Sequence, residues 1–462
     1  MLRRSVIVVG AGLVGALWAR LLAQRGHRVT LIERRPDLRC TDIPGGRSIN
    51  LAVSDRGWRG LRLAGLEERV RPFALPMEGR MIHDRAATTH FQPYGKPGQA
   101  IYSFHRRRLN ELLLTAVQEC PNTQLLFEHR CIDVDLDVPA VIVETPAGEL
   151  RRLDAEAVFG VDGAYSAVRS RLQHLEGFSY CQEYLDYGYK ELTLPPTAGG
   201  VWALEPRALH IWPRRSFMLI ALPNPDRSFT CTLFFPLEGE LSFAALRTEA
   251  DVRAFFQSEF PDVVPLMPRL TEEFFSNPTG SLLTIRCFPW SYDGKVLLLG
   301  DAAHAIVPFY GQGMNAGFED CVLLLDFLQH YPDDWATAFR AFERFRKPHA
   351  DAIAQLALEN FVEMRDKVAD PRFLLRKRLE QYLADHYPDR FIPLYTMVTF
   401  SHIPYAEALR RGQIQDRILD TLMTQTETET DWENPRLQQL MVELVVELEP
   451  YNLNSLSGAA PE

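Results

Sequence analysis

The stretch Ser5-Val6-Ile7-Val8-Val9-Gly10-Ala11-Gly12-Leu13-Val14-Gly15 decides the fold of this chain. Its first residues are mostly apolar and β-branched, which is typical of a strand buried on both faces. Three glycines follow at the G-x-G-x-x-G spacing, and residues 16–25 have a helical composition. A second buried strand is predicted at 29–32 and ends at Glu33. This β-α-β unit of about thirty residues predicts a dinucleotide site.

Each residue type in this motif has a physical task. Gly10 permits the tight turn, Gly12 lets the backbone approach a pyrophosphate, and Gly15 lets the helix lie close to the strand. The amides at the helix start would face the phosphates, and Glu33 could accept hydrogen bonds from a ribose. The motif alone does not separate NAD from FAD. The charged and then apolar start could pass for a signal peptide, but its cleavage would destroy the fingerprint.

Composition narrows the class of protein. A chain of 462 residues is too long for one ordinary core, so two or three domains are expected. Lys and Arg total 50 against 60 Asp and Glu, and the formal charge of −10 argues against a nucleic-acid-binding protein. No apolar run reaches the 18 or so residues of a membrane helix. Seven cysteines without a C-x-x-C pair and twelve histidines without ligand spacing predict reduced thiols, a cytoplasmic protein and no structural metal.

Later segments could complete a flavin nucleotide site. A buried run at 296–299 leads into Gly300-Asp301, and a glycine turn at 311–315 precedes a helix. The carboxylate could hold a sugar-chain hydroxyl, and the turn could present amides to an anionic ring edge. An ordinary third βα unit is the alternative. A strand-like run at 157–163 ends in Asp-Gly, and the arginines at 106–108 are either a solvated helix start or a phosphate contact.

The middle and the end of the chain have different patterns. Residues 208–213, 217–222 and 229–235 are three strand candidates separated by turns, which predicts an antiparallel sheet in a second domain. From about residue 336 the composition is helical.

Taken together, these motifs resemble the single-component FAD-dependent aromatic hydroxylases, and among them the kynurenine 3-monooxygenase family. The resemblance runs from about residue 5 to 415 and includes the stretches 46–52, 80–83, 210–213, 221–224, 298–304, 360–364 and 391–400. The expected fold is α/β, with a Rossmann-type FAD-binding domain, a substrate domain that holds the antiparallel sheet, and C-terminal helices. The predicted bounds are 1–75, 100–180 and 281–335 for the first, 76–99 and 181–280 for the second, and 336–462 for the third.

The resemblance implies a flavoprotein monooxygenase that converts L-kynurenine to 3-hydroxykynurenine with NADPH and O₂, through a C4a-hydroperoxyflavin. It implies no acid–base catalytic pair, because the cofactor carries the chemistry. The kynurenine carboxylate and amine would meet Arg80, Tyr94, Asn360 and Tyr395, and Phe309 and Tyr310 would line the pocket beside the flavin. Non-covalent FAD would lie on Gly10, Gly12, Val14, Gly15, Glu33, Ala52, Arg106, Cys131, Asp301, Met314 and Asn315.

Other interpretations are open at this point. Taken singly, Tyr395 could be a core residue and Arg80 a surface charge, although a planar guanidinium suits a bidentate carboxylate contact. The protein could hydroxylate another small aromatic substrate, be a flavin-bound regulatory protein without turnover, or be an NAD-dependent dehydrogenase. The eukaryotic enzymes of the family extend into a membrane anchor, whereas residues 437–449 are too short and too charged to span a bilayer.

Overall fold

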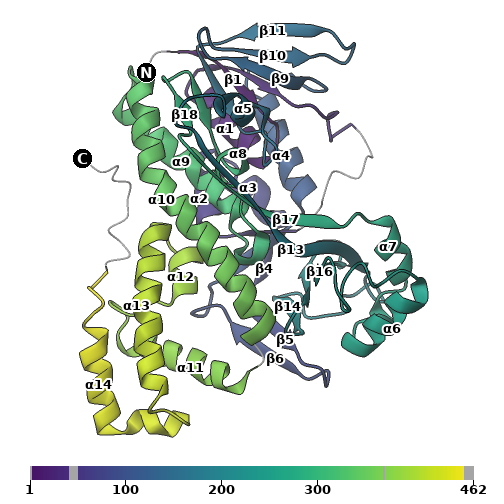
Figure 1. Cartoon of the computed structure of the whole chain (residues 1–462), viewed down its shortest axis with the longest axis vertical. Helices are drawn as coiled ribbons and strands as arrows, with labels where there is room; N and C mark the ends of the chain where they lie inside the picture. The colour runs from purple at the N-terminus through teal and green to yellow at the C-terminus, as the bar shows by residue number, and fades with distance from the viewer. Residues whose placement is uncertain (1–2, 41–49, 368–369, 452–462) are drawn as a thin grey trace.

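The computed structural model describes residues 3–40, 50–367 and 370–451. Its chain is built around two large sheets, and long helices lie along one side (Figure 1). The first sheet has the strand order β18-β19-β12-β1-β2-β8, and every neighbouring pair is parallel except β18 with β19. These strands span Ser291–Tyr292, Val296–Leu298, Ala157–Gly160, Ser5–Val9, Arg28–Ile32 and Thr123–Leu126.

Buried apolar residues fix this first sheet, as the sequence predicted. Four of the five residues of β1 are buried, and β1 pairs with β2 and β12. The helices α1 (Leu13–Gln24), α4 (Arg106–Gln118) and α9 (Gly313–His330) share one hydrophobic core with it. Two predicted helix starts were late: α1 begins at Leu13 instead of residue 16, and α9 begins at Gly313, inside the stretch 311–315 that was predicted as a turn before the helix. In both cases a glycine turn leads directly into the helix, so composition alone placed the boundary too far along.

The second sheet has the order β17-β13-β16-β15-β14-β5-β6. The three predicted strands are present as β14, β15 and β16, paired antiparallel as expected. The sheet also contains four further strands, of which β5 pairs with β14 in parallel. In sheet order, the strands span Gly280–Phe288, Ser179–Leu194, Phe229–Pro236, Met218–Pro223, Ala208–Pro213, Gly79–His83 and Thr89–Pro93.

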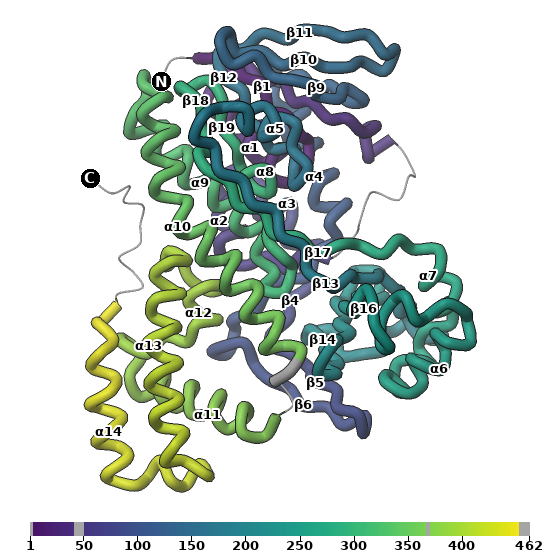
Figure 2. The backbone as a smooth tube through the Cα atoms, in the orientation of Figure 1, coloured from purple at the N-terminus to yellow at the C-terminus, as the bar shows by residue number. Residues whose placement is uncertain are grey.

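The two faces of the second sheet have different neighbours. On one face, α6 (Glu249–Glu259) and α7 (Leu270–Ser276) form a core with side chains such as Trp212 and Leu219. On the other face, Ile82, Met218 and Phe234 pack with residues of the C-terminal helices. Figure 2 shows β13 and β17 running together from the region of α5 down to this sheet. The second sheet therefore has one face that can wall a site.

The remaining elements before the C-terminal helices are short. One small sheet has the order β11-β10-β9 and another the order β3-β7-β4. Their strands span, in chain order, Leu51–Val53 (β3), Leu75–Met77 (β4), Ile101–Phe104 (β7), Arg130–Asp135 (β9), Ala140–Glu144 (β10) and Leu150–Asp154 (β11). The short helices are α2 (Asp55–Leu63), α3 (Glu67–Val70), α5 (Ala167–Leu172) and α8 (Asp301–His304).

The C-terminal part is helical, as predicted. Its helices are α10 (Trp335–Val362), α11 (Pro371–His386), α12 (Leu394–Thr399), α13 (Tyr405–Met423) and α14 (Pro435–Val445). Within the described ranges, none of the helices has the length and apolarity that crossing a membrane requires. The division of the chain into three domains at the stated bounds stays a prediction.

Candidate active site

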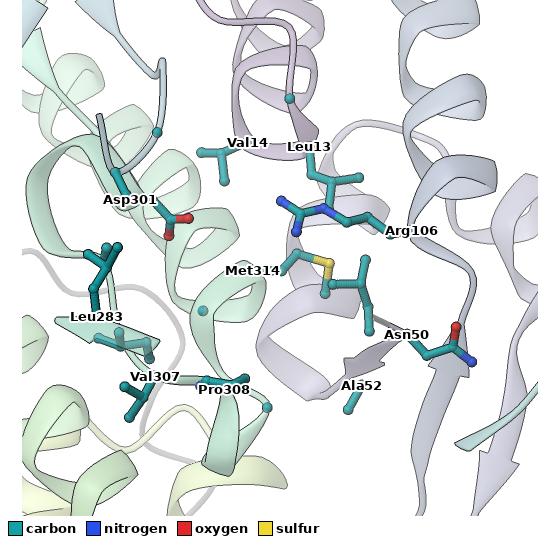
Figure 3. Close-up of a pocket in the computed structure, with 18 of the residues that line it drawn as sticks. Leu13, Val14, Asn50, Ala52, Arg106, Leu283, Asp301, Val307, Pro308 and Met314 are labelled. Atoms are coloured by element: carbon teal, nitrogen blue, oxygen red, sulfur yellow. The ribbon is translucent and has the colours of Figure 1, made fainter. Parts of the chain in front are cut away.

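A cavity of about 630 Å³ runs from the glycine fingerprint to the C-terminal helices. Its wall includes the turn after β1, the start of α9, the inner face of the second sheet and Tyr395 of α12. Figure 3 shows that side chains from these separate elements point into one space. One end is lined by the fingerprint and the other by aromatic side chains, so the two ends are suited to different ligands.

The three fingerprint glycines have different surroundings. A Cβ added to Gly10 would lie 2.5 Å from the carbonyl oxygen of Val161, and Gly10 has φ of +103°, where only glycine is unstrained. A Cβ on Gly15 would lie 1.9 Å from the Gly10 oxygen. A Cβ on Gly12 would meet no protein atom within 4 Å. Gly10 and Gly15 are therefore required by the turn itself, whereas Gly12 leaves open space on the cavity side.

Glu33 lies at the end of β2 and lines the cavity. Its Oε2 accepts a hydrogen bond from the Ala11 amide at 3.0 Å, and its Oε1 accepts two from Arg35. The Glu33 side chain is only 11% exposed. This carboxylate therefore braces the fingerprint turn, and its position at the strand end also suits a ribose contact.

Charged side chains reach the middle of the cavity. Arg106 of α4 and Asp301 of α8 both line it, and Figure 3 shows both side chains among those that point into the cavity. Both are exposed to the cavity or solvent, and neither has a hydrogen bond or ion pair with any other described residue within the usual distances. An unpaired guanidinium opposite the glycine turn suits a phosphate, and an unpaired carboxylate suits a hydroxyl.

Asn315 is not among the described residues that line the cavity. Its side chain is fully buried, with Nδ2 donating to the carbonyls of Ala52 at 2.8 Å and Gly311 at 2.7 Å, and Oδ1 accepting from the Ser54 amide. The side chain thus holds two cavity-lining turns together. Any contact of Asn315 with a cofactor would have to use its main chain.

Val14, Ala52 and Cys131 also line this end. Burial raises the pKa of the Cys131 thiol to about 12, so the thiol stays protonated. Asp162, at the end of β12, accepts from the Ser166 hydroxyl at 2.5 Å and from the Ala167 amide at 2.7 Å. Asp162 of the Asp-Gly pair therefore holds the start of α5 in place. An extended cavity with a glycine cradle, the unpaired Arg106 and the unpaired Asp301 fits FAD.

The far end of the cavity is aromatic and carries one cation. The rings of Tyr94 and Tyr395 are stacked, with centroids 4.8 Å apart, and the Arg80 guanidinium lies 5.7 Å and 5.3 Å from them. The Tyr310 ring also stacks with the Tyr395 ring, with centroids 5.6 Å apart. The structure thus brings together Arg80 of β5, Tyr94 just beyond β6 and Tyr395 of α12.

The electrostatics of this end favour an anion. Burial alone would lower the pKa of Arg80, but the nearby oxygens of Tyr94, Tyr395 and Glu363 raise that pKa above its ordinary value, so the guanidinium stays charged. Arg80 Nε is buried and has no hydrogen-bond partner among the described residues. Burial raises the pKa of Tyr395 well above its ordinary value, which keeps its hydroxyl a donor.

Asn360 is not among the described residues that line the cavity. It lies behind the wall, where its Nδ2 donates to the carbonyl of Phe309 at 2.8 Å. Phe309 itself lines the cavity, and its ring stacks on Phe361 with centroids 4.0 Å apart. Asn360 therefore positions the aromatic wall.

Sequence reasoning assigned no role to Glu363, whose Oε1 lies 3.6 Å from Arg80 Nη1. It also assigned none to Met218, Phe234 or Met364, which line the aromatic end. The stretch 360–364 was part of the family resemblance, so Glu363 and Met364 were visible as a motif. Their contacts depend on how α10 packs against the second sheet, which no local pattern encodes.

A flavin-sized cradle that opens into an aromatic, arginine-bearing pocket is the architecture of an FAD-dependent aromatic hydroxylase. The family model described as "FAD binding domain" matches residues 3–357. In the solved structures, the tetrameric form of 2-methyl-3-hydroxypyridine-5-carboxylic acid oxygenase is similar, with a TM-score of 0.65 at 21% identity over 81% of this chain and 95% of that chain. That likeness shows the fold alone.

The curated relatives are much more similar. Kynurenine 3-monooxygenase of Flavobacterium psychrophilum is 47% identical over 96% of this chain and 98% of its own length. The enzyme of that name from Myxococcus xanthus is 51% identical over 90% of both chains. The chain belongs to the kynurenine 3-monooxygenase family. It is a flavoprotein monooxygenase whose cofactor is FAD.

Proposed function

We propose that this enzyme hydroxylates L-kynurenine to 3-hydroxykynurenine, with NADPH and O₂ as co-substrates. One oxygen atom of O₂ enters the ring ortho to the amino group, the other leaves as water, and NADPH supplies the two electrons. The observation that carries the proposal is Arg80, a charged residue whose Nε is buried and unpartnered and whose guanidinium lies beside two stacked tyrosines. The names of the curated relatives point to the same substrate.

FAD, when bound, supplies the redox chemistry that takes up hydride and activates O₂. We propose that Gly10, Gly12 and Gly15 cradle its pyrophosphate with the α1 amides, that Arg106 neutralises phosphate charge, and that Asp301 accepts from a ribityl hydroxyl. Glu33 would accept from the ribose. The backbone of the turn at 311–315 would face the flavin ring, since Gly311, Gly313 and Met314 line the cavity there.

The aromatic end would bind and orient the substrate. Arg80 would pair with the kynurenine carboxylate, and the hydroxyls of Tyr94 and Tyr395 would donate to it. Glu363, beside Arg80, would face the amino acid ammonium. The apolar wall of Phe309 and Phe234 would receive the ring and keep water away, which protects the oxygen transfer from a wasteful release of peroxide.

The test is aerobic incubation of the FAD-loaded enzyme with NADPH and L-kynurenine, with mass detection of the product. A product heavier by one oxygen atom, which co-elutes with 3-hydroxykynurenine, is expected. The matched control substrate is kynuramine, which has the same ring and side chain but lacks the carboxylate, and it should be a far poorer substrate. Consumption of NADPH with release of peroxide alone would contradict the substrate and point to another aromatic compound.

A further inference from the structure

Three tyrosines are unusually exposed at the rim of the cavity. Tyr165 is 59% exposed, Tyr184 52% and Tyr180 38%. Tyr165 lies between β12 and α5, just after the Asp-Gly pair, whereas Tyr180 and Tyr184 lie on β13. Large exposed aromatic side chains that gather at one place mark a binding surface more often than scattered ones do. We call Tyr165, Tyr180, Gln182 and Tyr184 the rim patch.

Hydrogen bonds tie the rim patch into one ordered surface. Tyr180, Gln182 and Tyr184 share one face of β13, because alternate residues of a strand point the same way. The Tyr180 hydroxyl donates to Gln182 Oε1, and Gln182 Nε2 donates to the Tyr184 hydroxyl at 2.5 Å. The hydroxyls of Tyr184 and Tyr165 lie 3.3 Å apart. The rings are therefore held in fixed positions although they face solvent.

The rim patch is continuous with the cavity wall. Tyr165 itself lines the cavity. Tyr184 lies opposite Leu283 in the antiparallel β13–β17 register, so the two side chains are neighbours on one face. Leu283 also lines the cavity, and Figure 3 shows it close to Val307 and Asp301. The row of tyrosines thus leads from solvent to the place where the flavin would lie.

Cations accompany the rim patch. The Arg169 guanidinium lies 4.9 Å from the Tyr180 ring centre. Arg130 lines the cavity and pairs with Glu144 at 2.6 Å, and Arg171 of α5 lies 3.8 Å from Asp133. Both of these ion pairs are well exposed to solvent. Exposed ion pairs contribute little free energy, so a phosphate group can replace the carboxylate partner of either arginine. The rim can therefore take a ligand that has both flat rings and phosphates.

We propose that the rim patch is the docking site of NADPH, with a base of the nucleotide stacked on Tyr184 and Tyr180. This inference rests on the proposed function, in which NADPH reduces the bound flavin. The sequence has only one G-x-G-x-x-G fingerprint, so a second Rossmann site is not expected to hold the nucleotide. The nicotinamide must contact the flavin inside the cavity. The rest of the NADPH molecule must then extend out of the cavity across the rim.

The experiment measures how NADP⁺, which cannot turn over, binds to the FAD-loaded enzyme. Calorimetric titration gives its dissociation constant for the wild type, Tyr184→Ala and the double variant Tyr180→Ala/Tyr184→Ala. The dissociation constant should rise about tenfold or more in the double variant, because a stacked base loses its aromatic partners. Tyr184→Phe keeps the ring and should stay within about threefold of the wild type.

Phe275→Ala is the matched control, since Phe275 on α7 is 48% exposed and lies outside the cavity lining. It should leave NADP⁺ binding unchanged, and all variants should keep their FAD content and kynurenine affinity. If the double variant loses FAD, the dissociation constant of NADP⁺ is measured for the single variant Tyr180→Ala instead. An unchanged dissociation constant would overturn the docking site alone. No reduction of the wild-type flavin by NADPH would contradict the proposed function itself, and the docking site with it.

Discussion

At the scale of single residues, we expect alanine to have different effects at Gly12 and at Gly15, although both glycines belong to one motif. Gly15→Ala should destabilise the protein with or without FAD, because the new Cβ would overlap the Gly10 carbonyl. Gly12→Ala should leave the melting temperature of the apoprotein within about 1 °C of the wild type, since no protein atom lies near its Cβ. Its FAD dissociation constant should nevertheless rise at least about tenfold, because the methyl group would occupy the space of the pyrophosphate.

Thermal unfolding of the apoproteins and titration with FAD, followed by quenching of flavin fluorescence, separate these effects. Each variant is the control for the other, since both exchange a glycine for alanine in the same turn. An FAD affinity of Gly12→Ala equal to that of the wild type would show that the cofactor does not approach residue 12.

At this scale, Arg80 is the residue whose substitution tests the proposed binding of L-kynurenine. Arg80→Ala should raise the half-saturating concentration of L-kynurenine by roughly 10- to 100-fold, because a charge-assisted contact contributes about 1.5–3 kcal/mol. It should also divert NADPH electrons to peroxide, because a loosely held ring is poorly placed for oxygen transfer. Arg80→Lys keeps the charge but loses the planar fork, so an intermediate effect is expected. Unchanged kynurenine affinity in Arg80→Ala would disprove the assignment.

At the scale of elements, one hydrogen bond joins the C-terminal helices to the turn that faces the flavin. Tyr405, the first residue of α13, donates its hydroxyl to Gln312 Oε1 at 2.9 Å, and both residues are buried. The Arg56 guanidinium lies 4.0 Å from the Tyr405 ring centre and donates to the carbonyls of Val398 and Met397. The position of Gly311 and Gly313, which line the cavity, therefore depends on α13.

Tyr405→Phe should lower the melting temperature by a few degrees, since it leaves the buried Gln312 oxygen without its donor. It should also raise the fraction of NADPH electrons that end in peroxide, because the turn beside the flavin loses its support. Peroxide released per NADPH consumed is the measurement. Tyr382→Phe removes a hydroxyl from another C-terminal helix, far along from the turn, and should leave that ratio unchanged. Equal ratios in both variants would limit Tyr405 to a structural role.

The same elements show what the sequence could and could not predict. Strands β1 and β2 were predictable because short apolar runs beside a glycine turn have few alternative structures. Strand β13 was not, because seven of its sixteen residues are exposed and its polar start lacks an apolar alternation. That Arg80 and Tyr395 belong to one site was predicted from the family resemblance and not from a local pattern. The place of Asn360 behind Phe309 depends on the packing of α10 against a turn about fifty residues away, which local sequence does not encode.

At the scale of the whole molecule, three histidines make stability sensitive to acid. The pKa values of His210, His349 and His402 are lowered to about 4 each, by burial first and, for the last two, also by nearby arginines. In the unfolded chain these groups have their ordinary pKa near 6.5. Between about pH 6.5 and 4 the unfolded state therefore binds more protons than the folded state, so stability is retained above this window and is lost as the pH falls through it.

Asp320 titrates in a lower window. Its pKa is held at about 2, because His304 and Arg346 outweigh the opposing effect of burial, and its oxygens lie 2.6 Å and 2.7 Å from their nitrogens. A carboxyl with a lowered pKa stabilises the fold at any pH above its ordinary value and loses that effect only below about pH 4. The histidines should therefore dominate the first acid loss.

For this reason, the melting temperature of the apoprotein should fall as the pH is lowered from 7 to 4.5. The melting temperature of His349→Gln should fall less steeply over the same range. One proton fewer is taken up on unfolding, which reduces the slope by at most about 1.4 kcal/mol per pH unit. Glutamine can still accept the weak hydrogen bond that the Ala406 amide donates to His349 Nδ1 at 3.4 Å. His174→Gln is the control, since His174 is exposed and outside these cores. Parallel curves for His349→Gln and the wild type would show that His349 is not the buried neutral group described, and the acid loss would have to come from other groups such as His210 and His402.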